Sequence, residues 1–239
     1  MEYNKIYNES NLETLRRIDD LSIDYVLTSP PYNVGNNQMY GDGIKKYTQY
    51  DDKLDDYFTN QKTLIDELLR VTKKHIFYNI QMLAENKCAF LSLLGNYNNK
   101  IKDIIIWNKK MIPHIEPGIL SSAFEFIVIF SNDQPNKKKF YDANFKRGGM
   151  SNVFEIVNTH SNPYSDVHKA IMPLDIPRHF MMNFGKENDI WYDPYMGTGT
   201  TAVAAIKENK KYLGSEINKE YFDLSKKRID IEKTKKTLF

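Results

Sequence analysis

The stretch Asp193-Pro-Tyr-Met-Gly-Thr-Gly-Thr-Thr-Ala202 constrains the fold of this chain more than any other part of it. An apolar run, 190–192, precedes the stretch, and small residues suited to a helix, 201–207, follow it. The pattern predicts a strand, a glycine turn and a helix. Gly197 and Gly199 let the backbone turn tightly, and they let a ligand come close to the main chain.

The kind of ligand is indicated by the next predicted strand, which covers 211–215 and ends at the acid Glu216. A carboxylate at that place can accept hydrogen bonds from both hydroxyls of a ribose, so the unit is typical of a nucleoside-cofactor site. The spacing Gly197-x-Gly199-x-x-Ala202 also fits a dinucleotide site. However, Asp193 stands where the first strand ends, and a carboxylate there repels a pyrophosphate but attracts the cationic methionine part of S-adenosylmethionine. An ordinary strand-to-helix turn without a ligand is the alternative.

The second informative stretch is Thr28-Ser-Pro-Pro-Tyr-Asn33, which follows the apolar run 23–27 and should therefore lie at the carboxyl end of a strand. Its two prolines fix φ and hold the turn in one shape. The Ser29 hydroxyl and nearby backbone carbonyls can accept hydrogen bonds from an exocyclic NH2 group, and the Tyr32 ring can stack on a flat base. A rigid turn at the end of a strand is the structural alternative.

These two stretches, together with Gly214-Ser-Glu216, resemble the motifs of DNA amino-methyltransferases, which methylate N4 of cytosine or N6 of adenine. The catalytic motif comes first and the cofactor motif last, an order similar to the β-class of that family. The resemblance spans nearly the whole chain and implies a circularly permuted Rossmann-like α/β fold, with a mostly parallel sheet flanked by helices. It also implies a single methyltransferase domain, 1–239, with a small target-recognition insertion at about 131–165.

The resemblance assigns roles to residues, with S-adenosylmethionine as the cofactor and double-stranded DNA as the partner. The implied catalytic residues are Ser29, Pro30, Pro31 and Tyr32. The implied cofactor-binding residues are Glu9, Ser29, His168, Asp193, Tyr195, Gly197, Thr198, Gly199, Thr200, Thr201, Glu216 and Ile217. The match at Glu9 is loose, and helix capping or core packing explains His168 about equally well.

Residues 137–147 hold five cations against one acid, with aromatic side chains between them. The cations can neutralise phosphates, and the aromatic rings can stack on bases. In the family that the chain resembles, this stretch is the best candidate for target recognition, whereas a solvated surface loop is the structural alternative. The predicted DNA-binding residues are Lys137, Lys138, Lys139, Lys146 and Arg147.

The implied reaction is methylation of the amino group of a base that has been turned out of the duplex, because the stacked and paired nitrogen is otherwise inaccessible. Tyr32 would stack on that base, and Ser29 with the Pro30 carbonyl would accept the two amino hydrogens. The predicted base is cytosine, because Ser29 is typical of the cytosine enzymes, although Asn33 recurs among adenine enzymes. A DNA-binding subunit without catalysis and a protein glutamine methyltransferase are the rival functions.

Composition sets further limits. With 239 residues, 41% of them hydrophobic, the chain can bury a sizeable core. A single cysteine, Cys88, excludes a disulfide framework and favours a reducing compartment, so we expect the cytoplasm. No apolar run approaches the roughly 18 residues that a membrane span needs, so no membrane is expected. The five histidines show no metal-ligand spacing, so no metal is expected, and the net charge of +2 leaves nucleic-acid affinity to local patches. A homodimer and a cognate restriction endonuclease are the other partners that the resemblance suggests.

The rest of the chain alternates helical and strand patterns. A loop rich in Gly, Asn and Tyr, 34–50, is interpreted as a lid over the extruded base or as a long surface loop. Predicted helices cover 11–18, with Asn11 as the cap, 53–72, 82–95, 174–184 and 218–239. A short stretch of alternating apolar and polar residues covers 3–7. Further predicted strands cover 75–80, 101–107 and 124–130, the last two at the far edge of the sheet.

Overall fold

The computed structural model describes residues 1–33, 39–40, 44–45, 56–110, 117–118, 120–156 and 171–237. Its central feature is an eight-stranded sheet in the order β1-β10-β9-β2-β5-β7-β6-β8. The strands are β1 (Lys5–Tyr7), β2 (Ile23–Thr28), β5 (Thr72–Ile80), β6 (Ile101–Asn108), β7 (Phe124–Ser131), β8 (Val153–Glu155), β9 (Ile190–Asp193) and β10 (Lys211–Ser215). The helices are α1 (Asn11–Leu15), α2 (Tyr57–Val71), α3 (Lys87–Asn96), α4 (Asp175–Asn183), α5 (Thr200–Lys207) and α6 (Lys219–Thr237).

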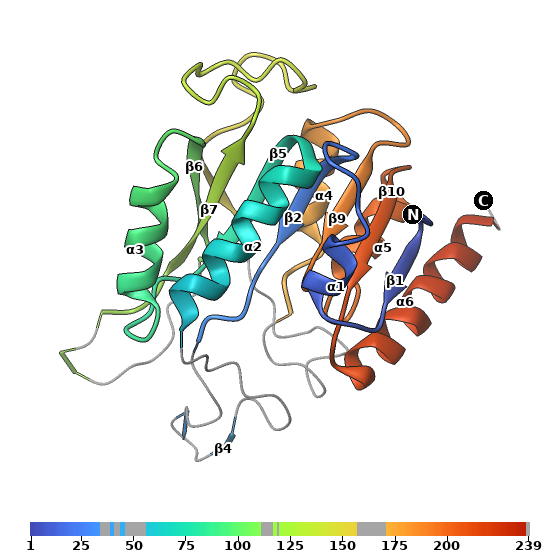
Figure 1. Cartoon of the computed structure of the whole chain (residues 1–239), viewed down its shortest axis with the longest axis horizontal. Helices are drawn as coiled ribbons and strands as arrows, with labels where there is room; N and C mark the ends of the chain where they lie inside the picture. The colour runs from blue at the N-terminus through green and yellow to red at the C-terminus, as the bar shows by residue number, and fades with distance from the viewer. Residues whose placement is uncertain are drawn as a thin grey trace.

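Helices cover both faces of this sheet, with α1, α2 and α3 on one side and α4, α5 and α6 on the other (Figure 1). The strands of the sheet pair in parallel except at β7, which runs antiparallel to β5 and to β6. A strand that has helices on both sides is buried along its length, and all six residues of β2 are buried. The predicted α/β architecture, a mostly parallel sheet flanked by helices, is confirmed.

The central strand β2 lies between β9 and β5 and positions the predicted catalytic turn. Val26 pairs with Tyr192 of β9, and Thr28 pairs with Tyr78 of β5, so the carboxyl ends of these three strands meet. We call the side of the sheet at which these parallel strands end the carboxyl edge; it runs across the strand ends and is distinct from the outermost strands. The two motifs, distant in sequence, follow neighbouring parallel strands at this edge, which is where open α/β sheets bind their ligands.

Several element boundaries differ from the prediction for local reasons. Ser10 caps α1 in place of Asn11, because the Ser10 side chain accepts from the Glu13 N–H while the Glu13 carboxylate accepts from the Ser10 N–H. β5 begins at Thr72 and not at residue 75, since Thr72 leaves α2 in an extended conformation. β6 and β7 are not the far edge of the sheet, because the short strand β8 pairs with β6.

Two predicted helices begin several residues later than expected, and one predicted loop is described only in part. α2 begins at Tyr57 and α3 at Lys87. The loop 34–50 lies outside the described residues, apart from β3 (Met39–Tyr40) and β4 (Ile44–Lys45), which pair antiparallel. None of the helices in the described part of the chain combines the length and apolar character that a bilayer-spanning segment requires.

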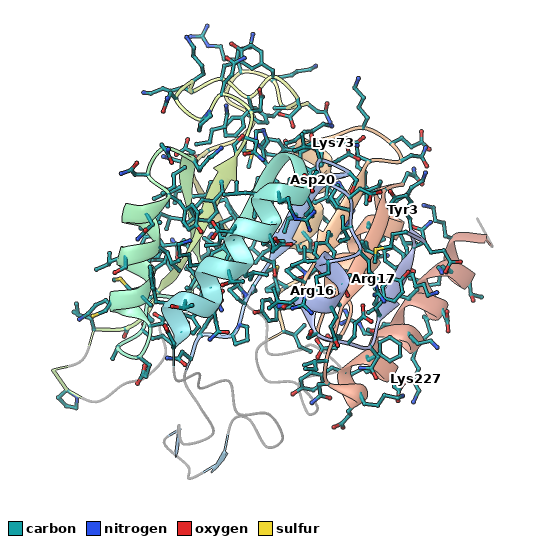
Figure 2. The ribbon with its side chains drawn as sticks, in the orientation of Figure 1. Tyr3, Arg16, Arg17, Asp20, Lys73 and Lys227 are labelled. Atoms are coloured by element: carbon teal, nitrogen blue, oxygen red, sulfur yellow. The ribbon has the colours of Figure 1, made fainter. Side chains whose placement is uncertain are left out.

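The segment 132–147, which follows β7, lies on the side of the sheet opposite the carboxyl edge, where the parallel strands begin (Figure 1). Ser131, the last residue of β7, pairs with His75 near the start of β5. Figure 2 labels Asp20 and Lys73 at this same edge, one before β2 and the other near the start of β5. The direction of β7 therefore separates this segment from the catalytic turn by most of the length of the sheet.

Asp142 turns inward from this segment and clamps it to the sheet. Its carboxylate accepts hydrogen bonds from the Tyr25 hydroxyl and from His75 Nε2, the latter at 2.9 Å. The Phe140 ring packs edge-on against His75 and Phe184, with ring centroids 5.2 and 5.3 Å apart. Burial raises the pKa of Asp142, but the hydrogen bonds from His75 and Tyr25 outweigh it and hold that pKa below its usual value. The Phe140 ring is therefore packed against the core and is not presented for stacking on a nucleic-acid base.

We predict that Asp142→Asn lowers the free energy of unfolding by about 2 kcal/mol at neutral pH, because two hydrogen bonds to a charged acceptor are weakened. Since the folded-state pKa is lowered, the carboxylate stabilises the protein above its unfolded pKa of about 4, and this contribution is lost as the pH falls through the folded pKa. Urea unfolding at about pH 7 and about pH 3 measures the effect, and the gap between wild type and variant should narrow at the lower pH. The exposed Asp223→Asn is the matched control, and an equal loss in both variants would contradict the clamp.

Candidate functional site

The predicted catalytic turn follows β2 and is held from several sides. The Tyr57 hydroxyl of α2 donates to the Pro31 carbonyl at 2.8 Å. The Asn86 side chain, just before α3, donates to the Tyr32 carbonyl at 3.0 Å. Asn33 ends the turn with a φ of 63°, a conformation that asparagine tolerates better than most residues. Together with the two prolines, these contacts fix the shape of the turn.

The side chains of Ser29 and Tyr32 belong to a hydrogen-bond network at the carboxyl edge. Ser29 Oγ lies 3.0 Å from the Tyr32 hydroxyl oxygen, and Asn79 Nδ2 lies 2.9 Å from the same oxygen. Glu125 Oε2 accepts from the Tyr32 hydroxyl at 2.8 Å and from Asn79 Nδ2 at 2.7 Å. Lys109 Nζ lies 2.7 Å from Glu125 Oε1 and completes a buried ion pair.

Sequence reasoning missed Asn79, Glu125 and Lys109 as site residues. A signal was present, because Asn79 and Glu125 interrupt apolar strand sequences, and a buried polar group is costly unless it has partners. Strand pairing explains why they meet. Asn79 pairs with Ile127, which is two residues from Glu125, so the two polar side chains share one face of the sheet.

The glycine loop after β9 is shaped by the two predicted acids. Asp193 accepts hydrogen bonds from the Tyr195 N–H at 3.0 Å and from the Thr201 hydroxyl at 2.6 Å. Glu216, which follows β10, accepts from the Gly197 N–H at 2.8 Å. Each carboxylate therefore uses part of its accepting capacity inside the protein and keeps further lone pairs for a ligand.

Gly197 and Gly199 both have positive φ, at 53° and 88°, but for different reasons. A Cβ on Gly199 would lie 2.9 Å from Ser225 Cβ, so this glycine lets α6 pack against the loop. A Cβ on Gly197 would find Tyr195 O, at 3.9 Å, as its nearest described neighbour. Both glycines make the turn, but Gly199 allows the packing of α6, whereas Gly197 leaves room for a ligand.

A further support for the loop, which the sequence did not predict, comes from α6. Arg228 Nη1 donates to the Thr198 carbonyl at 2.8 Å and to the Thr198 hydroxyl at 2.6 Å. A second hydroxyl, that of Thr200, lies 3.3 Å from the same nitrogen. The guanidinium presents several donors in a rigid plane, so α6 holds the loop in one conformation.

One pocket joins the glycine loop to the catalytic turn. Its lining is Ser29, Ile171, Met172, Asp193, Tyr195, Met196, Gly197, Thr198, Thr200 and Thr201. Ser29 from the first motif therefore lines the same pocket as residues of the second motif. Ile171 and Met172, which the sequence did not predict, add apolar surface to it.

The two acids that contact the glycine loop, Asp193 and Glu216, have raised pKa values because they are buried. Burial raises the pKa of Asp193 to about 6, against the hydrogen bonds that it accepts from Thr201 and Tyr195. Burial likewise raises the pKa of Glu216 to about 7, and the nearby Asp193 adds to the shift. A ligand that brings hydrogen-bond donors or positive charge favours the ionised forms, so the pocket suits such a ligand better than an anion.

Five predicted cofactor residues are not among those that line this pocket: Glu9, His168, Gly199, Glu216 and Ile217. Glu216 borders it, since its carboxylate accepts from the N–H of the lining residue Gly197. Glu9 pairs with Arg17 and accepts from the Thr14 hydroxyl at 2.6 Å, so its carboxylate supports the region of α1. Ile217 is 53% exposed beside Glu216. His168 lies outside the described residues.

The five cations that were predicted to bind DNA are also not brought to the pocket. They are exposed in the segment after β7, at the opposite edge of the sheet, and they are Lys137, Lys138, Lys139, Lys146 and Arg147. The nine residues of β5 span the distance between the two edges, roughly 25 Å. Target recognition by this segment at the pocket does not fit that placement.

Known proteins share both the sequence pattern and the fold of this chain. A family model described as DNA methylase, N6_N4_Mtase, matches residues 23–227. The chain is 27% identical over 255 residues to the orphan methyltransferase M.BamHII of Bacillus amyloliquefaciens, covering 89% of this chain and 90% of that protein. It is 25% identical over 244 residues to the DNA adenine methyltransferase YhdJ of Escherichia coli (strain K12), covering 92% of this chain and 80% of that protein. The solved structure of PvuII DNA methyltransferase, named as cytosine-N4-specific, matches with a TM-score of 0.71 at 17% identity, over 95% of this chain and 86% of the other, which shows the fold.

We predict that alanine substitutions at the two loop glycines differ in their cost to folding. Gly199→Ala forces a side chain into the left-handed region and against Ser225, so we expect a loss of about 2–4 kcal/mol in the free energy of unfolding. Gly197→Ala meets only the left-handed strain, about 1–2 kcal/mol. Urea unfolding of both variants without ligand measures the difference, and equal losses would show that the two glycines do not have separate roles.

Proposed function

The chain belongs to the DNA methylase family of N6 and N4 amino-methyltransferases, and we propose that it transfers a methyl group from S-adenosylmethionine to the exocyclic amino group of a base in double-stranded DNA. The observation that carries the proposal is the shared pocket, which Ser29 lines together with Asp193 and Gly197. This arrangement supports direct transfer between two ligands held side by side. A stable covalent link to the protein is not required.

The residues that line the pocket, and Glu216 and Ile217 beside it, fit S-adenosylmethionine, which supplies an electrophilic methyl group when bound. The Glu216 carboxylate can accept hydrogen bonds from the ribose hydroxyls, and the exposed Ile217 beside it offers apolar surface to the adenine ring. The open position at Gly197 admits a close approach to the main chain. Asp193 favours the positive charge of the methionine part, and Met172 provides apolar contact in the same pocket.

The main catalytic task of the protein is to position a weak nucleophile, the exocyclic amino nitrogen of the base. The amino nitrogen of a base is a poor nucleophile because its lone pair is delocalised into the ring, and in a duplex it is also stacked and paired. We expect the base to leave the stack, at a cost of roughly a few kcal/mol, and to stack on the Tyr32 ring. Ser29 Oγ and the Pro30 carbonyl then accept hydrogen bonds from the two amino hydrogens, which localises the lone pair for attack in line on the methyl carbon. As the nitrogen–carbon bond forms, the carbon–sulfur bond would break with the thioether as leaving group, and one amino proton would pass to solvent. Orientation of the reacting atoms supplies most of the rate.

Cytosine N4 is the target that we propose, since Ser29 is the residue typical of the cytosine enzymes that the motif resembles. Adenine N6 is the alternative within the same class. It is supported by Asn33 and by the similarity to a relative named as an adenine methyltransferase. Both targets present one NH2 group on a flat ring, so the chemistry of the turn separates them poorly.

The DNA duplex has to approach the carboxyl edge, because Ser29 faces the pocket there. We therefore propose that the contacts that place the target base come from residues at this edge and not from the cations of 137–147. The buried network around Ser29 favours an active enzyme over the rival of a DNA-binding subunit without catalysis. The family match disfavours the other rival, a protein glutamine methyltransferase.

Incubation of the protein with S-adenosylmethionine and DNA should yield N4-methylcytosine, identified by mass after digestion to nucleosides. We predict that Ser29→Ala lowers kcat by about 10- to 100-fold, because a hydrogen bond to the reacting group is lost. The exposed Ser92→Ala on α3 is the matched control. Methyladenine in place of N4-methylcytosine would change the base assignment. If no methyl group is transferred to any DNA at saturating cofactor, the proposal is wrong. Methyl transfer to protein alone would favour the rival function, a protein glutamine methyltransferase.

We predict that the affinity for S-adenosylmethionine rises between about pH 6 and about pH 8. Glu216, with a pKa raised to about 7, accepts the ribose hydrogens in its ionised form, so protonation should weaken binding by up to about tenfold per pH unit below that value. At about pH 8, Glu216→Ala should lose about 1.5–3 kcal/mol of binding free energy per hydrogen bond and flatten the dependence on pH. Calorimetry at both pH values measures this, with the exposed Glu220→Ala as control. A wild-type affinity that does not change with pH would remove the role of Glu216.

A further inference from the structure

Glu125 is a buried carboxylate in an apolar strand, and it contacts a proposed catalytic residue. The sequence of β7 is Phe-Glu-Phe-Ile-Val-Ile-Phe-Ser, and Glu125 is only 7% exposed. Its Oε2 accepts from the Tyr32 hydroxyl at 2.8 Å and from Asn79 Nδ2 at 2.7 Å, and its Oε1 lies 2.7 Å from Lys109 Nζ. A buried ion pair contributes little net stability, because the desolvation of two charges offsets their attraction. The position of this one, against Tyr32, points to a role in the site.

The direction of each hydrogen bond in the network follows from the carboxylate. A carboxylate only accepts, so the single hydroxyl hydrogen of Tyr32 points at Glu125. With that hydrogen engaged, the 3.0 Å contact between Ser29 Oγ and the Tyr32 oxygen requires the hydroxyl hydrogen of Ser29. Ser29 therefore donates to Tyr32. The two hydrogens of Asn79 Nδ2 make shorter contacts with Glu125 and Tyr32, so its 3.3 Å contact with Ser29 Oγ is a shared one. At least one lone pair of Ser29 Oγ can therefore accept from a further donor.

We propose that Glu125 is a positioning residue that acts through Tyr32 to make the Ser29 hydroxyl an acceptor toward the amino group of the target base. The inference rests on the proposed function, in which Ser29 accepts an amino hydrogen. A hydroxyl that turned its own hydrogen toward that NH2 group would repel it. The ammonium of Lys109 lies 2.7 Å from the other carboxylate oxygen, Oε1, and fixes the orientation of the carboxylate toward Tyr32.

Glu125→Gln tests the direction of the network at nearly constant shape. The Lys109 ammonium should hold the new amide oxygen, which leaves the amide NH2 facing Tyr32 and also Asn79 Nδ2, which loses its acceptor at this place. The Tyr32 oxygen then accepts, its hydrogen turns to Ser29, and the Ser29 hydrogen is released toward the base. We expect kcat for DNA methylation to fall by about 10- to 100-fold, while the Kd for S-adenosylmethionine changes by less than about twofold.

A double-mutant cycle separates this relay from a general structural effect. Tyr32→Phe keeps the ring but removes the hydroxyl through which Glu125 acts. In that background, Glu125→Gln should lower kcat by less than about a further twofold, because the effects of substitutions within one hydrogen-bond relay are not additive. Glu155→Gln is the matched control, since Glu155 makes an exposed ion pair with Lys110, at 2.6 Å, and should leave kcat unchanged.

The outcomes distinguish this inference from the proposed function. A wild-type protein that methylates DNA, combined with a Glu125→Gln variant of unchanged kcat, overturns the inference alone. An equal loss in the wild-type and Tyr32→Phe backgrounds does the same. A wild-type protein without methyl transfer overturns both. Thermal unfolding checks that each variant is folded. If Glu125→Gln does not fold, Tyr32→Phe decides, because an unchanged kcat there overturns the relay and a lower kcat at unchanged cofactor Kd supports it.

Discussion

The parallel pairing of β2 with β9 is the interaction on which the rest of this structure depends. The Ile190 N–H donates to Asp24 Oδ2 at 2.9 Å across a sequence separation of 166 residues. Farther along the same strands, the Tyr25 ring stacks on Trp191 with centroids 4.5 Å apart. These contacts align two strands whose following turns carry the two motifs. The pocket exists because the strands end side by side.

Buried charge gives this pocket its chemical character. Burial brings the pKa of Asp193 to about 6 and that of Glu216 to about 7, so both acids respond to the charge of a bound ligand near neutral pH. Glu125 has a different environment, since Lys109 pairs with it. Two acids thus face the proposed cofactor, and a third acts on the side chains that face the proposed base. Both placements suit methyl transfer, the activity that we propose for this member of the DNA methylase family.

Much of this architecture could be predicted because it follows from local patterns. The apolar runs of β2 and β9, the glycine loop and the acid at residue 216 are each visible within a few residues of sequence. Asn79 and Glu125 were missed because they meet only through the antiparallel register of β5 and β7, which no local pattern specifies. The same strand direction carries the cations of 137–147 away from the pocket. Their composition suggested a nucleic-acid contact, but composition does not state on which edge of a sheet a segment lies.

The pairing of β2 with β9 also has a consequence for how the protein is made. β2, β5, β6 and β7 come from residues 23–131, whereas β9 begins at Ile190. At about 5–20 residues per second, a ribosome needs roughly 10–30 s to pass from β2 to β9. Until β9 has been made, the side of β2 that it will cover is an open strand edge, with unpaired N–H and C=O groups that can pair with another chain. We expect the interval between the two strands to be the period in which a nascent chain most needs protection from aggregation.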